Sequence, residues 1–146
     1  MNDLEQMKEM KAQGFYCSQI LIKLGLELQG LENPELVRAM HGLAGGLGFT
    51  GELCGALSGG VSLLSLYAGK GLPEEIEDPR LNLMIMNLVN WFKQEYIPLY
   101  GSIRCQEILA VTDSGQPPPC PLLVAATFQR VKELLVENGF DLAGPE

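Results

Sequence analysis

Basic residues and histidine are scarce in this sequence. Ten Lys and Arg face 18 Asp and Glu, giving a formal net charge of −8, and there is a single histidine. The basic residues are scattered, whereas nucleic acid and anionic membrane surfaces are bound by basic patches. We therefore expect no nucleic-acid partner. Nothing around His41 has metal-ligand spacing, so we interpret it as a helix-end residue.

Long apolar runs are also missing. A helix that spans a membrane needs about 20 apolar residues. The uncharged run from Leu53 to Gly69 is shorter and contains serines, and the run from Leu81 to Phe92 is interrupted by asparagines. Residues 1–14 lack the apolar core and cleavage site of a secretory signal. We therefore expect a buried helix after Leu53, no membrane insertion and a cytoplasmic location.

The alternating pattern of β-strands is nearly absent, whereas helix signals recur. A chain of 146 residues corresponds to about one domain. We predict an all-α fold, a single-domain helical bundle of about six to seven helices over residues 1–146. Asn33-Pro34 and Asp78-Pro79 indicate helix starts, Thr50 is expected to open the central helix, and Pro98 to end the next one. The expected helices cover residues 2–13, 15–29, 34–40, 50–69, 79–96, 102–111 and 120–138.

The cysteines share a position relative to these helices. Cys17, Cys54, Cys105 and Cys120 each lie at the cap or in the first turn of an expected helix. Free backbone N–H groups and the helix dipole favour a thiolate there, so several converging helix starts would lower the pKa of the thiols. In a reducing compartment, such cysteines more often bind metals or act in redox chemistry than form disulfide staples. The competing interpretation is that they are inert core residues.

The spacing of the cysteines excludes several kinds of site. The sequence has no C-x-x-C pair, so a zinc ribbon, a thioredoxin-type motif and a C-x-x-C-H haem attachment are not expected. Structural zinc sites made of four cysteines bring their ligands in closely spaced pairs, which makes zinc the weaker metal candidate.

The central helix carries a stripe of small side chains. Cys54, Ser58 and Ser62 recur at helical spacing, with Gly55 and Gly59 beside them. Glycine in a helix interior costs about 0.5–1 kcal/mol relative to alanine, so packing or function must offset it. Such a face admits either another helix or a ligand unusually closely.

These residues resemble a known family. Cys54-Gly55-Ala56-Leu57-Ser58-Gly59 is similar to the central motif of the small bacterial redox-active proteins named for their C_GCAxxG_C_C pattern, although the name writes GCA where this chain reads CGA. Three further cysteines follow the pattern in order. The resemblance extends from about Gly14 to Leu135. It implies a redox-active site made by Cys17, Cys54, Cys105 and Cys120, with genes often placed near transporters. A similar domain in split-Soret cytochromes has cysteines associated with an iron–sulfur centre.

Three functions remain open at this point. The first is electron transfer or redox sensing by an iron–sulfur cluster, [2Fe–2S] or [4Fe–4S], held by the four cysteines, with Gly55 and Gly59 beside it. The second is thiol–disulfide exchange without a metal, for which a Cys105–Cys120 bond would close a loop worth roughly 3 kcal/mol. The third is an interaction subunit associated with a transporter. A redox partner protein is expected for the first two, a homodimer is compatible with the sequence, and no particular enzymatic reaction is assigned.

Overall fold

The fold is all-helical, as predicted. The computed structural model describes residues 2–144, and it has no β-strand among them beyond a single bridge between Leu53 and Arg104. The α-helices are α1 (Asp3–Ala12), α2 (Cys17–Leu28), α3 (Pro34–Ala39), α4 (Ala44–Leu47), α5 (Gly55–Ala68), α6 (Arg80–Tyr100), α7 (Cys105–Leu109) and α8 (Cys120–Glu137). Two 3₁₀ turns, η1 (His41–Leu43) and η2 (Ala110–Ser114), complete the described part. The one helix not expected from the sequence is the short α4.

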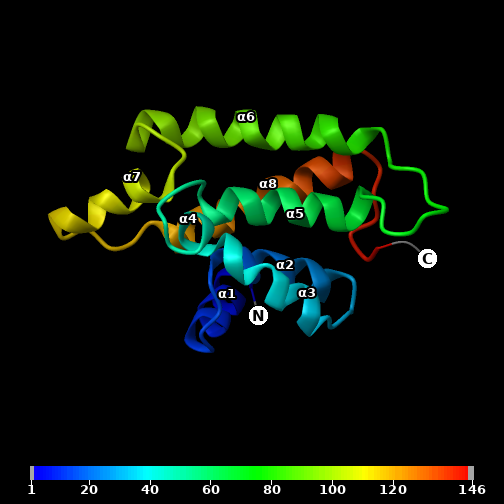
Figure 1. The fold of residues 1–146 in the computed structure, drawn as a ribbon, viewed down its shortest axis with the longest axis horizontal. Coiled ribbons are helices and arrows are strands. Elements are labelled where there is room, and N and C mark those ends of the chain that lie inside the picture. The colour runs from blue at the N-terminus through cyan, green and yellow to red at the C-terminus, as the bar shows by residue number, and fades with distance from the viewer. Residues whose placement is uncertain (1, 145–146) are drawn as a thin grey trace.

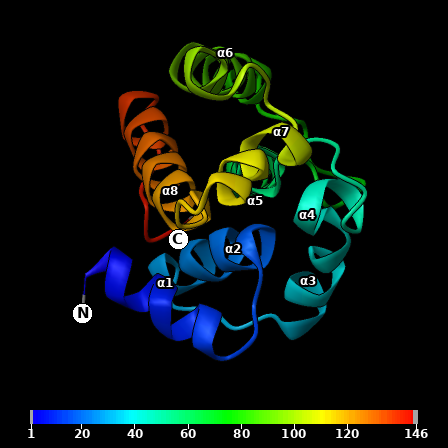
Figure 2. The same cartoon turned by 90° about the vertical axis from the view of Figure 1, so that its left-hand side faces the viewer.

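Helix α5 lies at the centre of the bundle. It contacts α2, α6 and α8, and the end-on view shows these three helices arranged around it (Figures 1 and 2). Leu63 and Leu64 of α5 are fully buried with Leu21, Phe92 and Phe128 from the three surrounding helices. The uncharged run after Leu53 is therefore a buried helix. Among residues 2–144, no helix has both the length and the apolar character needed to cross a membrane.

Small residues let α5 approach its neighbours closely. A Cβ atom on Gly59 would lie 3.0 Å from the Cα of Ser18 in α2, and one on Gly60 would lie 2.7 Å from the Cγ2 of Thr127 in α8. On α2, a Cβ on Gly25 would overlap Leu63. Gly59 and Gly60 of α5 and Gly25 of α2 therefore serve close helix packing.

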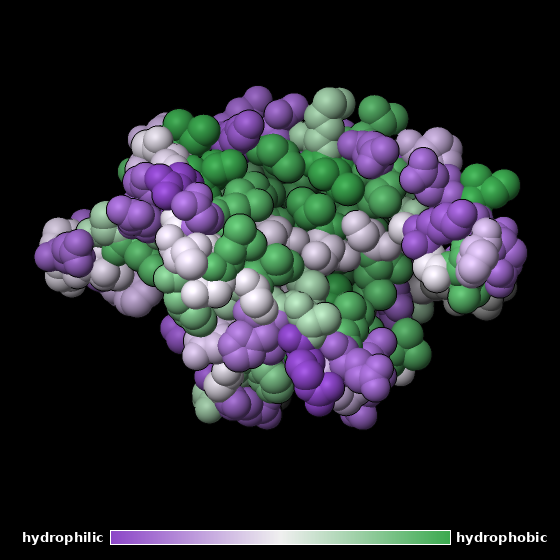
Figure 3. Space-filling view, viewed as in Figure 1, coloured by the Kyte–Doolittle hydropathy of each residue, from purple (hydrophilic) through white to green (hydrophobic). Residues whose placement is uncertain are grey.

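Helix α6 packs against the rest of the bundle through a narrow face. Only Met84, Leu88 and Phe92 of this helix are buried. On the face shown in Figure 3, hydrophobic side chains gather over the strip where α6 runs beside α5. Partly buried residues such as Ile85 and Val89 pack there against the core.

Two predicted helix boundaries are wrong. Thr50 does not open α5, because its hydroxyl donates to the carbonyls of Gly46 and Leu47 at 2.8 and 2.9 Å and so closes the preceding turn. Pro98 does not end α6, which continues to Tyr100 and stops at Gly101 (φ +77°). A proline near a helix end removes only one hydrogen bond. The partial burial of Tyr96 and Tyr100 against the core stabilises this last turn.

Other boundaries agree within one to three residues. Asn2 and Asn33 cap α1 and α3, as predicted, through side-chain oxygens that accept from Glu5 N and Leu36 N. Helix α7 begins at Cys105 and not at Ser102, whose hydroxyl accepts instead from the backbone N–H of Arg104 at 3.0 Å. Polar side chains of this kind stabilise a turn as readily as a helix start.

Candidate functional site

Each of the four cysteines begins a helix. Cys17, Cys105 and Cys120 are the first residues of α2, α7 and α8, and Cys54 is the N-cap residue of α5. This confirms the predicted position at the cap or in the first turn. These helices start at the same end of the molecule, the end at which α7 projects (Figures 1 and 2). All four cysteines are free thiols in this structure.

A short antiparallel bridge holds the starts of α5 and α7 side by side. The backbone N–H of Cys54 donates to Ile103 O at 3.0 Å, and the N–H of Cys105 donates to Glu52 O at 2.6 Å. These bonds fix the register of Leu53 opposite Arg104. The segments that carry Cys54 and Cys105, which are far apart in the sequence, are thereby held side by side.

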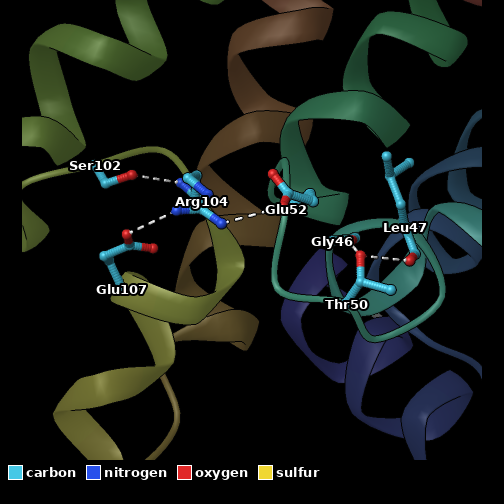
Figure 4. A network of polar contacts seen from close by, with 7 residues as sticks. All are labelled: Gly46, Leu47, Thr50, Glu52, Ser102, Arg104 and Glu107. Carbon is cyan, nitrogen blue, oxygen red and sulfur yellow. Dashed lines mark hydrogen bonds and ion pairs between the residues drawn. The ribbon is translucent and has the colours of Figure 1, made fainter.

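Arg104 reinforces this bridge from its exposed side. Its guanidinium contacts Glu52 at 3.1 Å and Glu107 at 3.2 Å, so it links both segments of the bridge (Figure 4). The three side chains are well exposed, and ion pairs of this kind typically contribute about 0–1 kcal/mol. The backbone bonds, and not the ion pairs, are the main constraint on the cysteines.

Cys17 lies between the glycine-rich segment, residues 42–51, and α5. The backbone N–H of Gly45 forms a hydrogen bond with its thiol, and a Cβ on Gly55 would overlap its Sγ. Gly55 therefore leaves space for Cys17, and its part in cofactor binding remains a prediction. Gly59, one turn further on, lies against α2, which is the packing alternative considered for it, and its part in cofactor binding remains a prediction.

The glycine-rich segment is strained where it approaches Cys17. Leu47 and Phe49 have φ values of +66° and +64°, in the left-handed region that large side chains rarely adopt. Each such residue costs about 1–3 kcal/mol and persists only where the surroundings enforce it. Backbone strain of this kind is concentrated at functional sites, which adds the segment to the candidate site.

Three of the cysteines share a cavity. Cys17, Cys105 and Cys120 line a space of about 330 Å³ together with apolar side chains and two lysines of α1, Lys8 and Lys11. Cys54 is buried at the start of α5 and does not line this cavity. Its thiol is nevertheless close enough to Cys17 and Cys120 for their charges to affect its pKa.

Burial reverses the pKa shift expected from the helix starts. Burial raises the pKa of all four thiols, to about 12 for Cys54 and about 11 for Cys120. The N–H groups of Ala56 and Leu57 lower the pKa of Cys54, but by less than burial raises it. The expectation of lowered thiol pKa values is therefore wrong, because desolvation disfavours the thiolate more than the helix starts favour it.

The four thiols have the chemistry of an iron–sulfur ligand set but not its arrangement. Such clusters are held by cysteine thiolates, so the residue types fit. Within residues 2–144, no group of three or more His, Cys, Asp or Glu side chains is arranged to hold a metal ion. His41 is exposed at the start of η1, with its ring 5.4 Å from that of Tyr16.

The sequence alone missed part of the cavity wall. Lys8 and Lys11 of α1 line it, as do Tyr16 and Phe49, whose rings are 5.1 Å apart. Met7 and Lys11 are one turn apart on α1, so the sequence indicates that they lie on the same face of this helix. Nothing in the sequence placed that face against the cysteines.

These features define a class of protein: an all-helical chain that gathers four thiols at the starts of four helices. Comparison with known families gives the same result. Residues 15–134 match the family described as "putative redox-active protein (C_GCAxxG_C_C)", and the chain belongs to this family. A comparison with curated proteins and with solved structures finds no match.

Proposed function

We propose that the four cysteines form one redox site, which binds an iron–sulfur cluster and exchanges electrons with a partner protein. The observation that carries the proposal is the convergence of four cysteines, each at the start of a different helix, on one end of the bundle. Burial of all four as inert core residues would not require this common position. A bound cluster would supply one-electron transfer at a potential set by burial and by hydrogen bonds to its sulfurs.

The raised pKa values count against free reactive thiols. A cysteine that attacks disulfides does so as a thiolate, and thiols buried in apolar surroundings are inert. Cys54, with a pKa of about 12, is fully protonated at neutral pH. Metal binding deprotonates a coordinating thiol outright, so a high pKa in the metal-free protein weakens metal binding at neutral pH without excluding that role.

Groups that stabilise negative charge already surround the sulfurs. The N–H groups of Ala56 and Leu57 act on Cys54, that of Gly45 acts on Cys17, and the ammonium of Lys11 acts on Cys120. Each of them lowers the pKa of its thiol. Around a cluster, the same groups would offset the charge of the thiolates and tune its potential.

The test is the metal content of the intact protein. We expect protein purified without oxygen, or reconstituted with iron and sulfide, to be brown and to contain iron and acid-labile sulfide in similar amounts. Zinc is measured in the same sample, because a zinc site would use the same thiols. Colourless protein that holds neither iron nor sulfide after reconstitution would contradict the proposal.

A disulfide between Cys105 and Cys120 is a second candidate. Both residues line the cavity, and Cys105 is close enough for its charge to raise the pKa of Cys120. Closing the bond would release two electrons and two protons, which a disulfide of a partner protein would take up as it is reduced to two thiols. Thiol counting after exposure to an oxidised dithiol distinguishes the candidates, because a count of four under every condition excludes this one.

A further inference from the structure

We propose that the cavity beside the cysteines binds a small apolar anion, a molecule with a hydrocarbon or aromatic body and one negatively charged group. The proposal goes beyond the redox role of the cysteines and concerns the metal-free protein, because a cluster held by Cys17, Cys105 and Cys120 would occupy part of the same cavity. Three observations support it: the composition of the walls, the sign of the charges, and the aromatic side chains at the surface.

The walls of the cavity suit an apolar body. Met7, Phe15, Ile20, Leu109 and Val124 contribute apolar side chains from α1, α2, α7, α8 and the turn before α2. The volume of about 330 Å³ is at the lower end of the range for small-molecule sites. A cavity of this volume has room for a small molecule.

The charges that line the cavity are positive in an otherwise acidic protein. Lys8 and Lys11 contribute to its wall, and among residues 2–144 none that lines it carries a carboxylate. Neither lysine takes part in an ion pair within the part of the chain that the structure describes. Lys11 lies close enough to Cys120 to lower the pKa of that thiol. An anionic group would thus meet two unpaired ammonium groups next to the sulfurs.

Two exposed aromatic side chains complete the wall. Tyr16 and Phe49 line the cavity although 43% and 60% of their surfaces are exposed. Phe49 is held there in a left-handed backbone conformation, with its ring where a Cβ on Gly45 would lie. Holding Phe49 in this backbone conformation costs free energy. Stacking of its exposed ring on a bound molecule would offset that cost.

The test uses octanoate as the anionic probe and octan-1-ol as its neutral counterpart. Both are titrated calorimetrically into metal-free protein, and iron is measured in a separate reconstituted sample, so that failure to bind iron and failure to bind octanoate are read separately. We expect octanoate to bind more tightly than octan-1-ol. Lys11→Met should weaken octanoate by about fivefold, the loss expected for one ion pair, and leave octan-1-ol unchanged.

Two further variants test whether binding depends on the cavity and on a charge within it. Lys93→Met removes a positive charge from an exposed position on α6, away from the cavity, and should leave octanoate binding unchanged. Leu109→Trp adds bulk to the cavity wall and should weaken both probes. No heat of binding from octanoate, equal affinity for the two probes, or equal effects of Lys11→Met and Lys93→Met would each overturn the proposal.

Discussion

The protonation state of the cysteines is set at the scale of the single residue, by burial. Four thiols at helix starts would be acidic if they were exposed, yet their pKa values rise because desolvation dominates. The helix N–H groups offset part of this rise in pKa, and they would stabilise the negative charge of a thiolate if one formed. The metal-free site therefore consists of protonated, weakly reactive thiols.

This account predicts how stability depends on pH. The pKa of Cys54 rises from the ordinary value of 9.0 to about 12 in the folded protein. Between these values the unfolded chain loses the thiol proton and the folded chain keeps it, so the free energy of unfolding should fall as pH rises from 9 to 12. Urea unfolding of metal-free protein measures this fall, which should be smaller in Cys54→Ala by at least about 1 kcal/mol. Parallel pH profiles for the two proteins would contradict the burial argument.

A second residue-scale prediction concerns Gly55. A methyl group at this position would overlap Sγ of Cys17 and lie 3.2 Å from the carbonyl oxygen of Leu43. We expect Gly55→Ala to lower the free energy of unfolding by about 1–3 kcal/mol, the usual cost of overpacking. Gly42→Ala is the control, because a Cβ there meets nothing within 4 Å. Chemical denaturation of the two variants should therefore differ, and equal stabilities would show that the space beside Cys17 is not constrained.

The sequence predicted the positions of the cysteines but not their pKa values. Caps and prolines are local signals, so the starts of α2 and α8 could be placed to within two residues of Cys17 and Cys120. Burial depends on what packs over each thiol. For Cys17 this includes Gly45 and Gly55, which no local pattern brings together with it.

At the scale of the element, close helix packing and one backbone bridge position the site. The bridge pairs residues 51–54 with residues 103–106 through hydrogen bonds between segments about 50 positions apart. Pairings at such a distance leave no periodic signal in either segment. This is why the sequence indicates a helix at Thr50, and why it places Cys54 and Cys105 in one site without predicting the backbone bridge between their segments.

The crossing of α2 and α5 gives the third prediction. Gly59→Ala would place a methyl group 2.9 Å from Cδ1 of Leu21 and 3.0 Å from Cα of Ser18, so the two helices must separate. We expect a loss of about 1–3 kcal/mol in the free energy of unfolding, in spite of the higher helix propensity of alanine. Ser62→Ala, on the same helix at a partly exposed position, should be close to neutral in thermal and urea unfolding. If Gly59→Ala were equally neutral, the two helices would not be in contact at this point.

At the scale of the whole molecule, the fold class was predictable from the sequence, whereas the site was predictable only in part. Helical periodicity and the absence of alternating strands were enough for an all-α bundle, which is confirmed. The cavity was not predictable, because its wall combines α1, the glycine-rich segment and the starts of three further helices. The four cysteines come from across most of the chain, and tertiary packing alone gathers their helix starts at one end.

This arrangement leads to the fourth prediction, which concerns the role of each cysteine. If the four cysteines act as one site, Cys17→Ser, Cys54→Ser, Cys105→Ser and Cys120→Ser should each lower the bound iron and sulfide well below the wild-type amount, because every thiolate is a ligand. Ser62→Ala should keep the wild-type content, and far-ultraviolet circular dichroism shows which variants remain folded.

The measurement that tests the central claim most directly is therefore the content of iron and acid-labile sulfide, with the visible spectrum, of the wild type and these variants after anaerobic reconstitution. The account predicts a coloured wild type that contains iron and sulfide, and a loss of both in each folded cysteine variant. A wild type without iron, or folded cysteine variants that all retain the wild-type content, would contradict it.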